Sequence, residues 1–270
     1  MATPSILTRL THRKTGSIAH ITISRPSKLN ALDTPLLEKL PSTIQSVTSL
    51  NADLLGIVLT GAGPKSFVGG ADIAEMAALD SPAAARSFIT KVHKACRSLR
   101  DCPVPVIGRV NGYALGAGCE IAASCDLRVA GQNAVFGMPE VRVGIPSVVE
   151  AALLPGLIGW GRTRQLLMLG ENISADEAFH WGLVEKLVEQ DMLDEAVESW
   201  LGQLEKNGPI AVRRQKALMR TWENVSMEQA IQAGVAAFGE CFDAKEGEVT
   251  EPARMMGAFF QDKAKNRASS

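Results

Sequence analysis

The run LLGIVLTGAG, residues 54–63, is almost entirely apolar and ends in glycines. Such a run predicts a strand buried on both faces, because a strand with one face in water alternates apolar and polar residues. SIAHITISRP, residues 17–26, does alternate, and it predicts a half-buried strand ended by Pro26. VPVIGRVNGY and DLRVAGQNAVFG, residues 104–113 and 126–137, each predict a further strand, although Pro105 weakens the first.

Helical patterns lie between and after these strands, and three of them start with a capping signal. The signals are Ser81 followed by proline, Ser174 with Glu177, and Ser226 with Gln229. The helix after Ser81 repeats apolar residues on one face, namely Phe88, Val92, Cys96 and Leu99. From about residue 190 onward the pattern is helical throughout. The order of elements predicts an α/β core over residues 1–195 and a helical region over residues 196–270.

The composition is that of an ordinary globular protein, with 46% apolar residues, 21% charged residues and a net charge of −1. A near-neutral chain has no strong field to attract nucleic acid or an anionic membrane surface. No apolar run reaches the roughly 18 residues needed to span a bilayer. The N-terminal residues include Arg9, Arg13 and Lys14 but continue into a strand-like pattern, so we interpret them as folded chain. We expect a cytoplasmic protein, with a mitochondrial or peroxisomal location left open.

The cysteines form an odd set without a CxxC pair: Cys96, Cys102, Cys119, Cys125 and Cys241. Most of them lie among apolar residues, so we expect buried, reduced thiols rather than disulfides. The four histidines are not spaced like metal ligands. The sequence therefore predicts no metal site.

Two strand ends lead into glycines and then into a helix, in SFVGGADIAEM (66–76) and VNGYALGAGCE (110–120). Neither stretch matches a dinucleotide-binding or phosphate-binding glycine motif, and tight turns without a ligand would look similar in isolation. Free N–H groups at a helix start can, however, bind developing negative charge. The second stretch reaches Glu120 among small apolar residues, and FGMPE later ends in Glu140. Two carboxylates beside two such turns indicate acid–base work on a carbonyl compound.

Several motifs, taken in order, resemble the crotonase (enoyl-CoA hydratase/isomerase) superfamily. They are RPSKLNALD at 25–33, the first glycine turn, VNGYALGAGCEIAASCDLRVA at 110–130, FGMPEVRVGIP at 136–146 and ISADEAFHWGLVEKLV at 173–188. The resemblance covers about residues 15–190. It implies an α/β fold in which repeated ββα units wind into a spiral, with C-terminal helices used for trimerisation. It also implies an acyl-CoA substrate, no cofactor besides the CoA of that substrate, and a homotrimer or a hexamer.

The resemblance implies roles for individual residues. The backbone N–H groups of Ala71 and Ala117 correspond to the oxyanion hole for a thioester carbonyl, and Glu120 and Glu140 correspond to the catalytic pair of a hydratase. The implied reaction is addition of water across the 2,3 double bond of a 2-enoyl-CoA. Residues that correspond to substrate contacts are Lys28, Ala31, Leu32, Ala71, Asp72, Ile73 and Gly118, with Lys263 as a candidate for a CoA phosphate.

The chain departs from the hydratase pattern in two places. Position 117 is usually glycine in the hydratases and is Ala117 here. The segment VRVGIPSVVEAALLP, residues 141–155, lacks a residue before its IP and carries Glu150 where typical hydratases have glycine. A similar GIP occurs in hydroxycinnamoyl-CoA hydratase-lyases. Glu150 is therefore either an acid at a helix start that faces solvent, or a substrate-contacting residue of the acyl pocket.

Three functions are compatible with these patterns. The first is hydration of a 2-enoyl-CoA, which the presence of both glutamates favours. The second is another crotonase-type acyl-CoA reaction: double-bond isomerisation, hydratase-lyase cleavage or decarboxylation. The third is a non-catalytic binding or scaffold protein, or one that binds RNA, against which the intact glutamate pair and the near-neutral charge argue.

Overall fold

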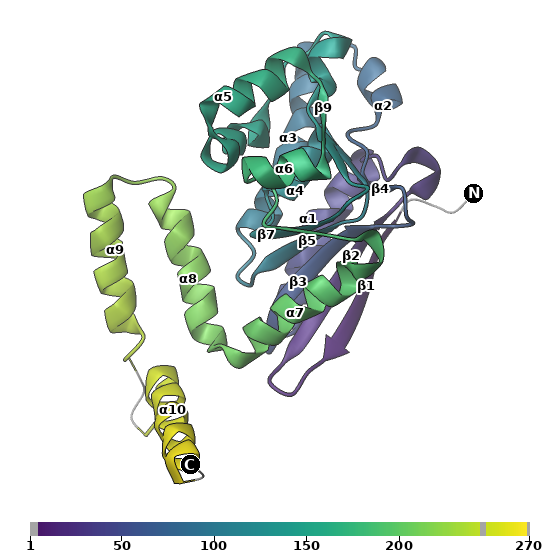
Figure 1. Ribbon diagram of the computed structural model, residues 1–270. Coiled ribbons are helices and arrows are strands. Elements are labelled where there is room, and N and C mark those ends of the chain that lie inside the picture. The colour runs from purple at the N-terminus through teal and green to yellow at the C-terminus, as the bar shows by residue number, and fades with distance from the viewer. Residues whose placement is uncertain (1–4, 244–246, 269–270) are drawn as a thin grey trace. The chain divides into compact units, whose positions relative to one another are not determined.

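The computed structural model describes residues 5–243 and 247–268 (Figure 1). The chain divides into two compact units, Met1–Leu201 and Gly202–Ser270, which we name the core unit and the C-terminal unit. The division falls inside helix α7 (Leu193–Lys206), and so does the domain boundary proposed from the sequence at residue 195.

The core unit contains a six-stranded sheet with the spatial order β1-β2-β3-β5-β7-β10. Its strands are β1 (Ser5–His12), β2 (Ser17–Ser24), β3 (Leu54–Gly61), β5 (Val106–Val110), β7 (Leu127–Gly131) and β10 (Lys186–Val188). β1 and β2 pair antiparallel, and all other neighbours in this sheet are parallel. The predicted half-buried strand β2 and the predicted fully buried strand β3 are both confirmed.

A second, four-stranded sheet has the order β4-β6-β8-β9. Its strands are β4 (Ser66–Val68), β6 (Tyr113–Leu115), β8 (Val135–Gly137) and β9 (Asn172–Ser174), of which the first three run parallel. The prediction of a single strand in DLRVAGQNAVFG is wrong, because this stretch forms β7 in the larger sheet and β8 in the smaller one. A turn separates the two strands, and in it the Ala134 N–H donates to the Gly131 carbonyl over 2.9 Å.

The chain passes repeatedly from the larger sheet to the smaller one and then into a helix. β3 and β4 are followed by α2 (Ile73–Ala77) and α3 (Pro82–Arg100), and β5 and β6 are followed by α4 (Ala117–Ala123). α3 packs against both α4 and α1 (Thr34–Leu50) (Figure 1). This succession is the repeated ββα arrangement that the resemblance implied, so the predicted α/β class is confirmed.

The three capping signals are also confirmed. Ser81, Ser174 and Ser226 accept hydrogen bonds from the first turns of α3, α6 (Ala175–Trp181) and α9 (Met227–Glu240). The predicted apolar face of α3 is buried. The core unit is completed by α5 (Leu154–Leu169) and by the 3₁₀ helices η1 (Pro26–Lys28), η2 (Pro139–Val143), η3 (Val149–Leu153) and η4 (Gln190–Met192).

The described part of the C-terminal unit is helical, as predicted. It contains the end of α7 together with α8 (Pro209–Trp222), α9 and α10 (Glu251–Ala268). Among its described side chains only Lys216 and Ala230 are buried. Its large apolar side chains that are more than half exposed include Ile210, Met227, Ile231, Val235, Phe238, Met256, Phe259 and Phe260.

The thiols lie where the sequence placed them. Four of the five cysteines are buried, Cys241 is partly exposed, and all five are free. Within residues 5–243 and 247–268, no helix has the length and apolar character required to cross a membrane.

Candidate active site

The ends of three neighbouring strands bring the predicted site residues together. β4, β6 and β8 are adjacent and parallel in the smaller sheet, so their carboxyl ends meet at one edge. Ala71 follows β4, Ala117 follows β6, and Glu140 follows β8. The edge of an open sheet at the carboxyl ends of its strands is where α/β proteins most often bind ligands.

A cavity of about 340 Å³ opens at this edge. Its wall includes both glycine turns, Ala71, Ala117, Glu120 and Glu140. The remaining lining is mostly apolar and comprises Ile73, Met76, Ile89, Val92, Leu115, Pro139, Val143, Ile145, Pro146 and Val148, with Arg142 as a charged member. A mainly apolar cavity with a few convergent polar groups is the usual form of a small-molecule site.

Two backbone N–H groups at this wall have no hydrogen-bond partner among the described residues. The neighbours of Ala71 are engaged, because the Gly70 carbonyl and the Asp72 N–H both bond to Leu32, but the Ala71 N–H is not. Ala117 is the first residue of α4, where an N–H has no acceptor within the helix. The cavity thus has two backbone donors available to an anionic oxygen.

Glu120 is held in α4, a helix whose residues are otherwise small or apolar and all buried. Only 4% of the Glu120 surface is exposed, and its Oε1 accepts a hydrogen bond of 3.1 Å from the Ala151 N–H. The pKa of Glu120 is raised from 4.5 to about 8, mainly by burial; the hydrogen bond from Ala151 opposes the rise, and the charges of Glu140 and Glu150 add to it. The raised pKa favours the protonated form of Glu120 at neutral pH.

Glu140 reaches the same cavity from η2. Its Oε2 accepts a hydrogen bond of 2.8 Å from the Ser147 hydroxyl. Its Oε1 lies against Gly116, so closely that a Cβ added at that glycine would be 2.6 Å away. Gly116 also has φ +51, a conformation that favours glycine. The turn before α4 therefore leaves room for the Glu140 carboxylate in the cavity that Glu120 also lines.

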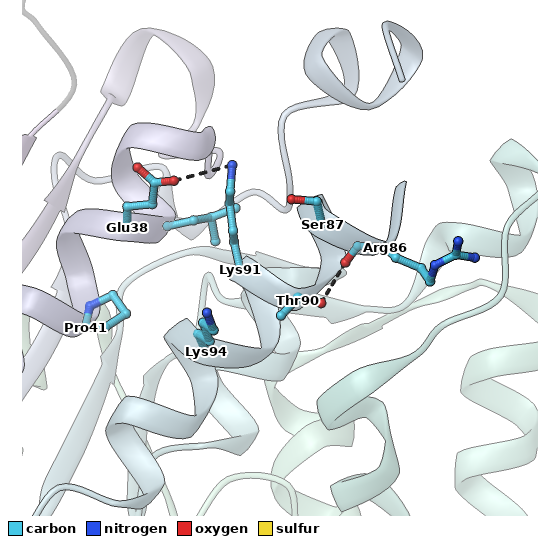
Figure 2. A pocket seen from close by; sticks show the side chains of 8 residues that line it. Glu38, Pro41, Arg86, Ser87, Thr90, Lys91 and Lys94 are labelled. Carbon is cyan, nitrogen blue, oxygen red and sulfur yellow. Dashed lines mark hydrogen bonds and ion pairs between the residues drawn. The ribbon is translucent and has the colours of Figure 1, made fainter. Parts of the chain in front are cut away.

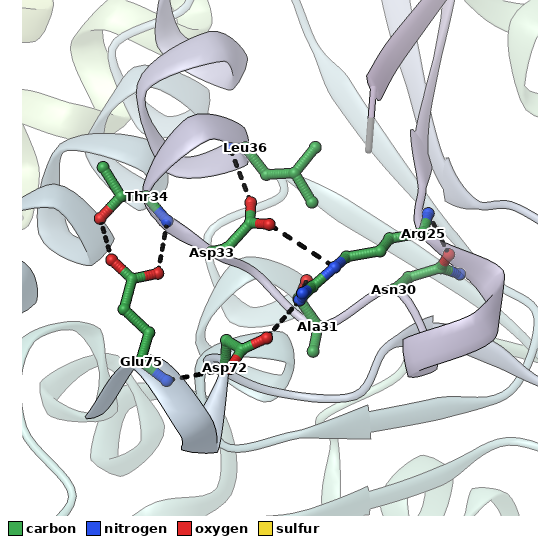
Figure 3. Close-up of polar contacts among 8 residues, drawn as sticks. All are labelled: Arg25, Asn30, Ala31, Asp33, Thr34, Leu36, Asp72 and Glu75. Carbon is green, nitrogen blue, oxygen red and sulfur yellow. Dashed lines mark hydrogen bonds and ion pairs between the residues drawn. The ribbon is translucent and has the colours of Figure 1, made fainter. Parts of the chain in front are cut away.

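A polar network ties the first glycine turn to the RPSKLNALD loop (Figure 3). The Arg25 guanidinium pairs with Asp72 and, over 3.5 Å, with Asp33. The Glu75 carboxylate accepts from both the N–H and the hydroxyl of Thr34. The Arg25 hydrogen bond lowers the pKa of Asp72. Asp72, predicted to lie along the substrate, thus has a structural partner, and Arg25 is a residue that the sequence reasoning missed.

The other predicted substrate contacts are dispersed. Ile73 lines the cavity and is 67% exposed, whereas Gly118 is buried and its Cα faces the Val68 carbonyl. Lys28 is exposed on η1, Ala31 is half-buried, and Leu32 is fully buried. Lys263 is exposed on α10, in the C-terminal unit. All of these assignments, including that of Ile73, stay predictions.

Glu150 is buried, so the interpretation that it faces solvent is wrong. Only 3% of its surface is exposed, and its Oε1 lies 2.9 Å from Nδ1 of His93 on α3. Burial raises the pKa of Glu150, while the charge and hydrogen bond of His93 lower it. Glu150 is not among the described residues that line the cavity. His93 is a second residue that the sequence reasoning missed, because nothing in its spacing points to a partner in η3.

A separate hollow of about 450 Å³ lies between α1 and α3 (Figure 2). Its lining includes the charged residues Glu38, Arg86, Lys91 and Lys94. The Lys91 ammonium is 3.4 Å from the Glu38 carboxylate, and the Thr90 hydroxyl donates to the Arg86 carbonyl over 2.7 Å. None of the predicted site residues lies in this lining.

Comparison with known proteins identifies the family of this chain. Residues 13–262 match the family described as enoyl-CoA hydratase/isomerase. A short-chain-enoyl-CoA hydratase of Clostridium acetobutylicum is 40% identical over 86% of this chain and 89% of its own length. A crotonyl-CoA hydratase of Syntrophomonas wolfei is 41% identical over 87% of this chain and 91% of its own length.

Solved structures show the same fold. An enoyl-CoA hydratase from Bacillus anthracis superimposes with a TM-score of 0.84 at 30% identity, covering 95% of this chain and 96% of that one. An enoyl-CoA hydratase from Mycobacterium smegmatis gives 0.86 at 26% identity, with 95% and 96% coverage. With matches over nearly its whole length, the chain belongs to the enoyl-CoA hydratase/isomerase family of enzymes, with the crotonase fold.

Proposed function

We propose that the protein adds water across the 2,3 double bond of a 2-enoyl-CoA thioester. The observation that carries the proposal is the convergence of two backbone donors and two carboxylates on one cavity. Isomerisation needs a proton moved between two carbons, whereas hydration needs a water held and activated as well. Two carboxylates on one cavity suit the second requirement.

The thioester carbonyl oxygen would accept hydrogen bonds from the N–H groups of Ala71 and Ala117. Attack at C3 moves negative charge onto this oxygen, and preorganised donors stabilise the resulting enolate-like state. Removing one such donor typically lowers kcat by about 10²–10³. The donor of Ala117 is a backbone group, so replacing the usual glycine leaves it in place.

The carboxylates would share one proton between them. Because burial raises the pKa of Glu120 to about 8, the pair keeps that proton at neutral pH. Glu120 and Glu140 hold one water. The water oxygen forms the new bond to C3, one proton of the water passes to the pair, and Glu140 delivers a proton to C2. The pair ends the cycle with the same number of protons.

We infer a short acyl chain. Two relatives of about 40% identity are named for short-chain enoyl-CoA and for crotonyl-CoA. The cavity volume of about 340 Å³ is modest, and much of its wall is apolar. The CoA portion would extend along Lys28 and Ala31 and past Asp72.

We also propose a homotrimer, alone or paired into a hexamer. The support is the C-terminal unit, where many large apolar side chains are exposed and little is buried within the unit itself. The molar mass in solution, measured by light scattering on the full chain, tests this proposal. A trimer or hexamer supports it, and a monomer overturns it.

A panel of acyl-CoA thioesters tests the reaction. The full chain is incubated with short, long and polar 2-enoyl-CoAs, a 3-enoyl-CoA, a β-hydroxyacyl-CoA that could be cleaved, and a carboxylated acyl-CoA. Products are identified by mass. We expect hydration to be the fastest reaction and short 2-enoyl-CoAs to be the best substrates. Isomerisation, cleavage or decarboxylation without comparable hydration would overturn the proposal.

A further inference from the structure

Next to the proposed catalytic pair lies a third carboxylate, that of Glu150, which is buried and which the proposed reaction does not use. Glu150 Oε1 contacts His93 Nδ1 over 2.9 Å, but no described residue donates a hydrogen bond to Glu150 Oε2. Burying a carboxylate with an unsatisfied oxygen is unfavourable for folding. The question is therefore which other part of the structure depends on Glu150.

The residue after Glu150 makes the hydrogen bond that the structure gives to the Glu120 carboxylate. The Ala151 N–H is shared between the Val148 carbonyl at 3.0 Å and Glu120 Oε1 at 3.1 Å. How a three-centre bond divides between two acceptors depends on how the donor is oriented. The orientation of Glu120 is therefore linked to the conformation of residues 148–151.

That conformation is strained. Val149 has φ +42, in the left-handed region, where a branched side chain is unfavourable. A strained turn persists only when the surrounding contacts hold it. The His93–Glu150 contact is one of these, because it joins η3 to the long helix α3 immediately beside Val149.

We propose that His93 and Glu150 are positioning residues, whose contact holds the η3 turn so that the Ala151 N–H orients Glu120. The proposal rests on the proposed function of Glu120. If Glu150 is a positioning residue, replacing it should change the rate of the chemical step to the same extent for every acyl chain. The alternative expected from the sequence, direct contact with the substrate, would instead change the preference among acyl chains.

The charged groups around Glu150 determine what a change of its charge would do. α3 presents His93, Cys96 and Arg100 to it, and α4 presents Glu120. α5, the third element packed on η3, carries Arg162 and Arg164, which contact His180 and the rings of Trp181 and Trp160. The negative charge of Glu150 raises the pKa of Glu120. Removing that charge without moving the turn should therefore lower the pKa of Glu120.

Three variants distinguish the two possible roles of Glu150, which are to hold the η3 turn and to supply a negative charge near Glu120. Glu150→Ala removes the contact and the charge, His93→Ala removes the contact alone, and Glu150→Gln removes the charge but keeps a group that can bond to either tautomer of His93. Glu198→Gln is the matched control, because Glu198 also pairs with a basic side chain, that of Arg13, but is about half exposed and is absent from the cavity wall. Each variant is assayed for kcat, KM and melting temperature.

We expect Glu150→Ala and His93→Ala each to lower kcat by about 10–100-fold, since a misplacement of about 1 Å can cost on the order of 10²-fold. KM should change little, and the fall in kcat should be alike for short, long and polar substrates. The double variant should lose about as much as either single variant, because the pair acts as a unit. Glu150→Gln should keep kcat within about threefold of the wild type.

Three results would overturn the proposal. One is a change in melting temperature with kcat unaltered, and another is additive losses in the double variant. The third is a loss of activity confined to one class of acyl chain, which would indicate that Glu150 contacts the substrate directly.

A second readout does not depend on turnover. NMR titration of carboxyl-labelled glutamate, assigned with Glu120→Gln, follows the protonation of Glu120 directly. We expect its midpoint at lower pH in Glu150→Gln than in the wild type, and an unchanged midpoint would contradict the coupling. If the wild type does not hydrate any enoyl-CoA but the midpoint still shifts, the proposed function fails while the link between Glu150 and Glu120 stands.

Discussion

The two sides of the cavity are built by different means. On one side, the glycine turns at 69–71 and 116–120 follow strands of one sheet, so backbone geometry places their N–H groups and Glu120. On the other side, the segment 139–151 consists of η2, a connection and the start of η3, and much of it is exposed. Side-chain hydrogen bonds hold that segment, such as the one from Ser147 to Glu140.

This difference determines how substitutions on each side of the cavity should affect catalysis. Groups placed by a sheet and a helix start can be displaced only by changing the backbone, so substitutions that disturb the backbone there should have large effects. Groups placed by side-chain contacts can be moved in small steps. We expect the turns to carry the common chemistry of the site and the segment 139–151 to adjust it.

The largest effects should come from the carboxylates, one from each side. Glu120→Gln and Glu140→Gln should each lower kcat by about 10²–10⁴, the usual contribution of a general acid–base group. The double variant should lose much less than the product of the two single effects, because both groups act on one water. Steady-state kinetics on the best 2-enoyl-CoA measure this. Near-full activity in either single variant would remove that residue from the mechanism.

The next effect tests the contact between the two sides. Gly116→Ala places a Cβ 2.6 Å from Glu140 Oε1 and puts an L-residue at φ +51. We expect kcat to fall by roughly 10²-fold, as for a misplaced catalytic group, with the fold retained by circular dichroism. Gly156→Ala is a matched control, because a Cβ at Gly156 meets no atom within 4 Å. Equal activity of the two variants would mean that the position of the Glu140 side chain does not depend on Gly116.

A smaller effect tests whether residue 117 faces the substrate. Ala117→Gly keeps the N–H and should change kcat/KM only slightly. Ala117→Val keeps the N–H too, but its branched side chain would crowd the thioester, so kcat/KM should fall by at least about tenfold. The kinetics of the two variants are compared side by side. If both match the wild type, residue 117 lies away from the thioester.

The sequence predicts the turn side well and the segment 139–151 poorly. Strand ends followed by glycines are local patterns, so the amino-acid sequence alone points to the two turns and to Glu120, and the family resemblance adds Ala71 and Ala117. Glu140 is found through its motif, but its bond to Ser147 depends on a turn without regular periodicity. The partners of Glu150 and Asp72, which are His93 and Arg25, lie far away in sequence, and only the folded chain brings them together. The sequence does not reveal the splitting of 126–137 into two strands, because a tight turn of small and polar residues does not interrupt the apolar pattern strongly.

The smallest effect concerns the side held by side chains. Ser147→Ala removes one hydrogen bond to Glu140, an interaction worth on the order of 1.5–3 kcal/mol when it involves a charged group. We expect kcat to fall about tenfold, less than for Gly116→Ala, because the Glu140 side chain still packs against Gly116. Ser147→Thr, which keeps the hydroxyl, should restore most of the activity. A loss as large as that of Glu140→Gln would show that Ser147 has a direct part in the reaction.

The pH dependence of kcat/KM for a short 2-enoyl-CoA tests the central claim most directly. The pKa of Glu120 is raised to about 8, so the pair holds its shared proton below that pH and loses it above. The account predicts that wild-type kcat/KM falls as pH rises through about 8. It also predicts that the residual activity of Glu120→Gln lacks this fall. A wild-type profile that is flat through this range, or a fall that persists unchanged in Glu120→Gln, would contradict the account.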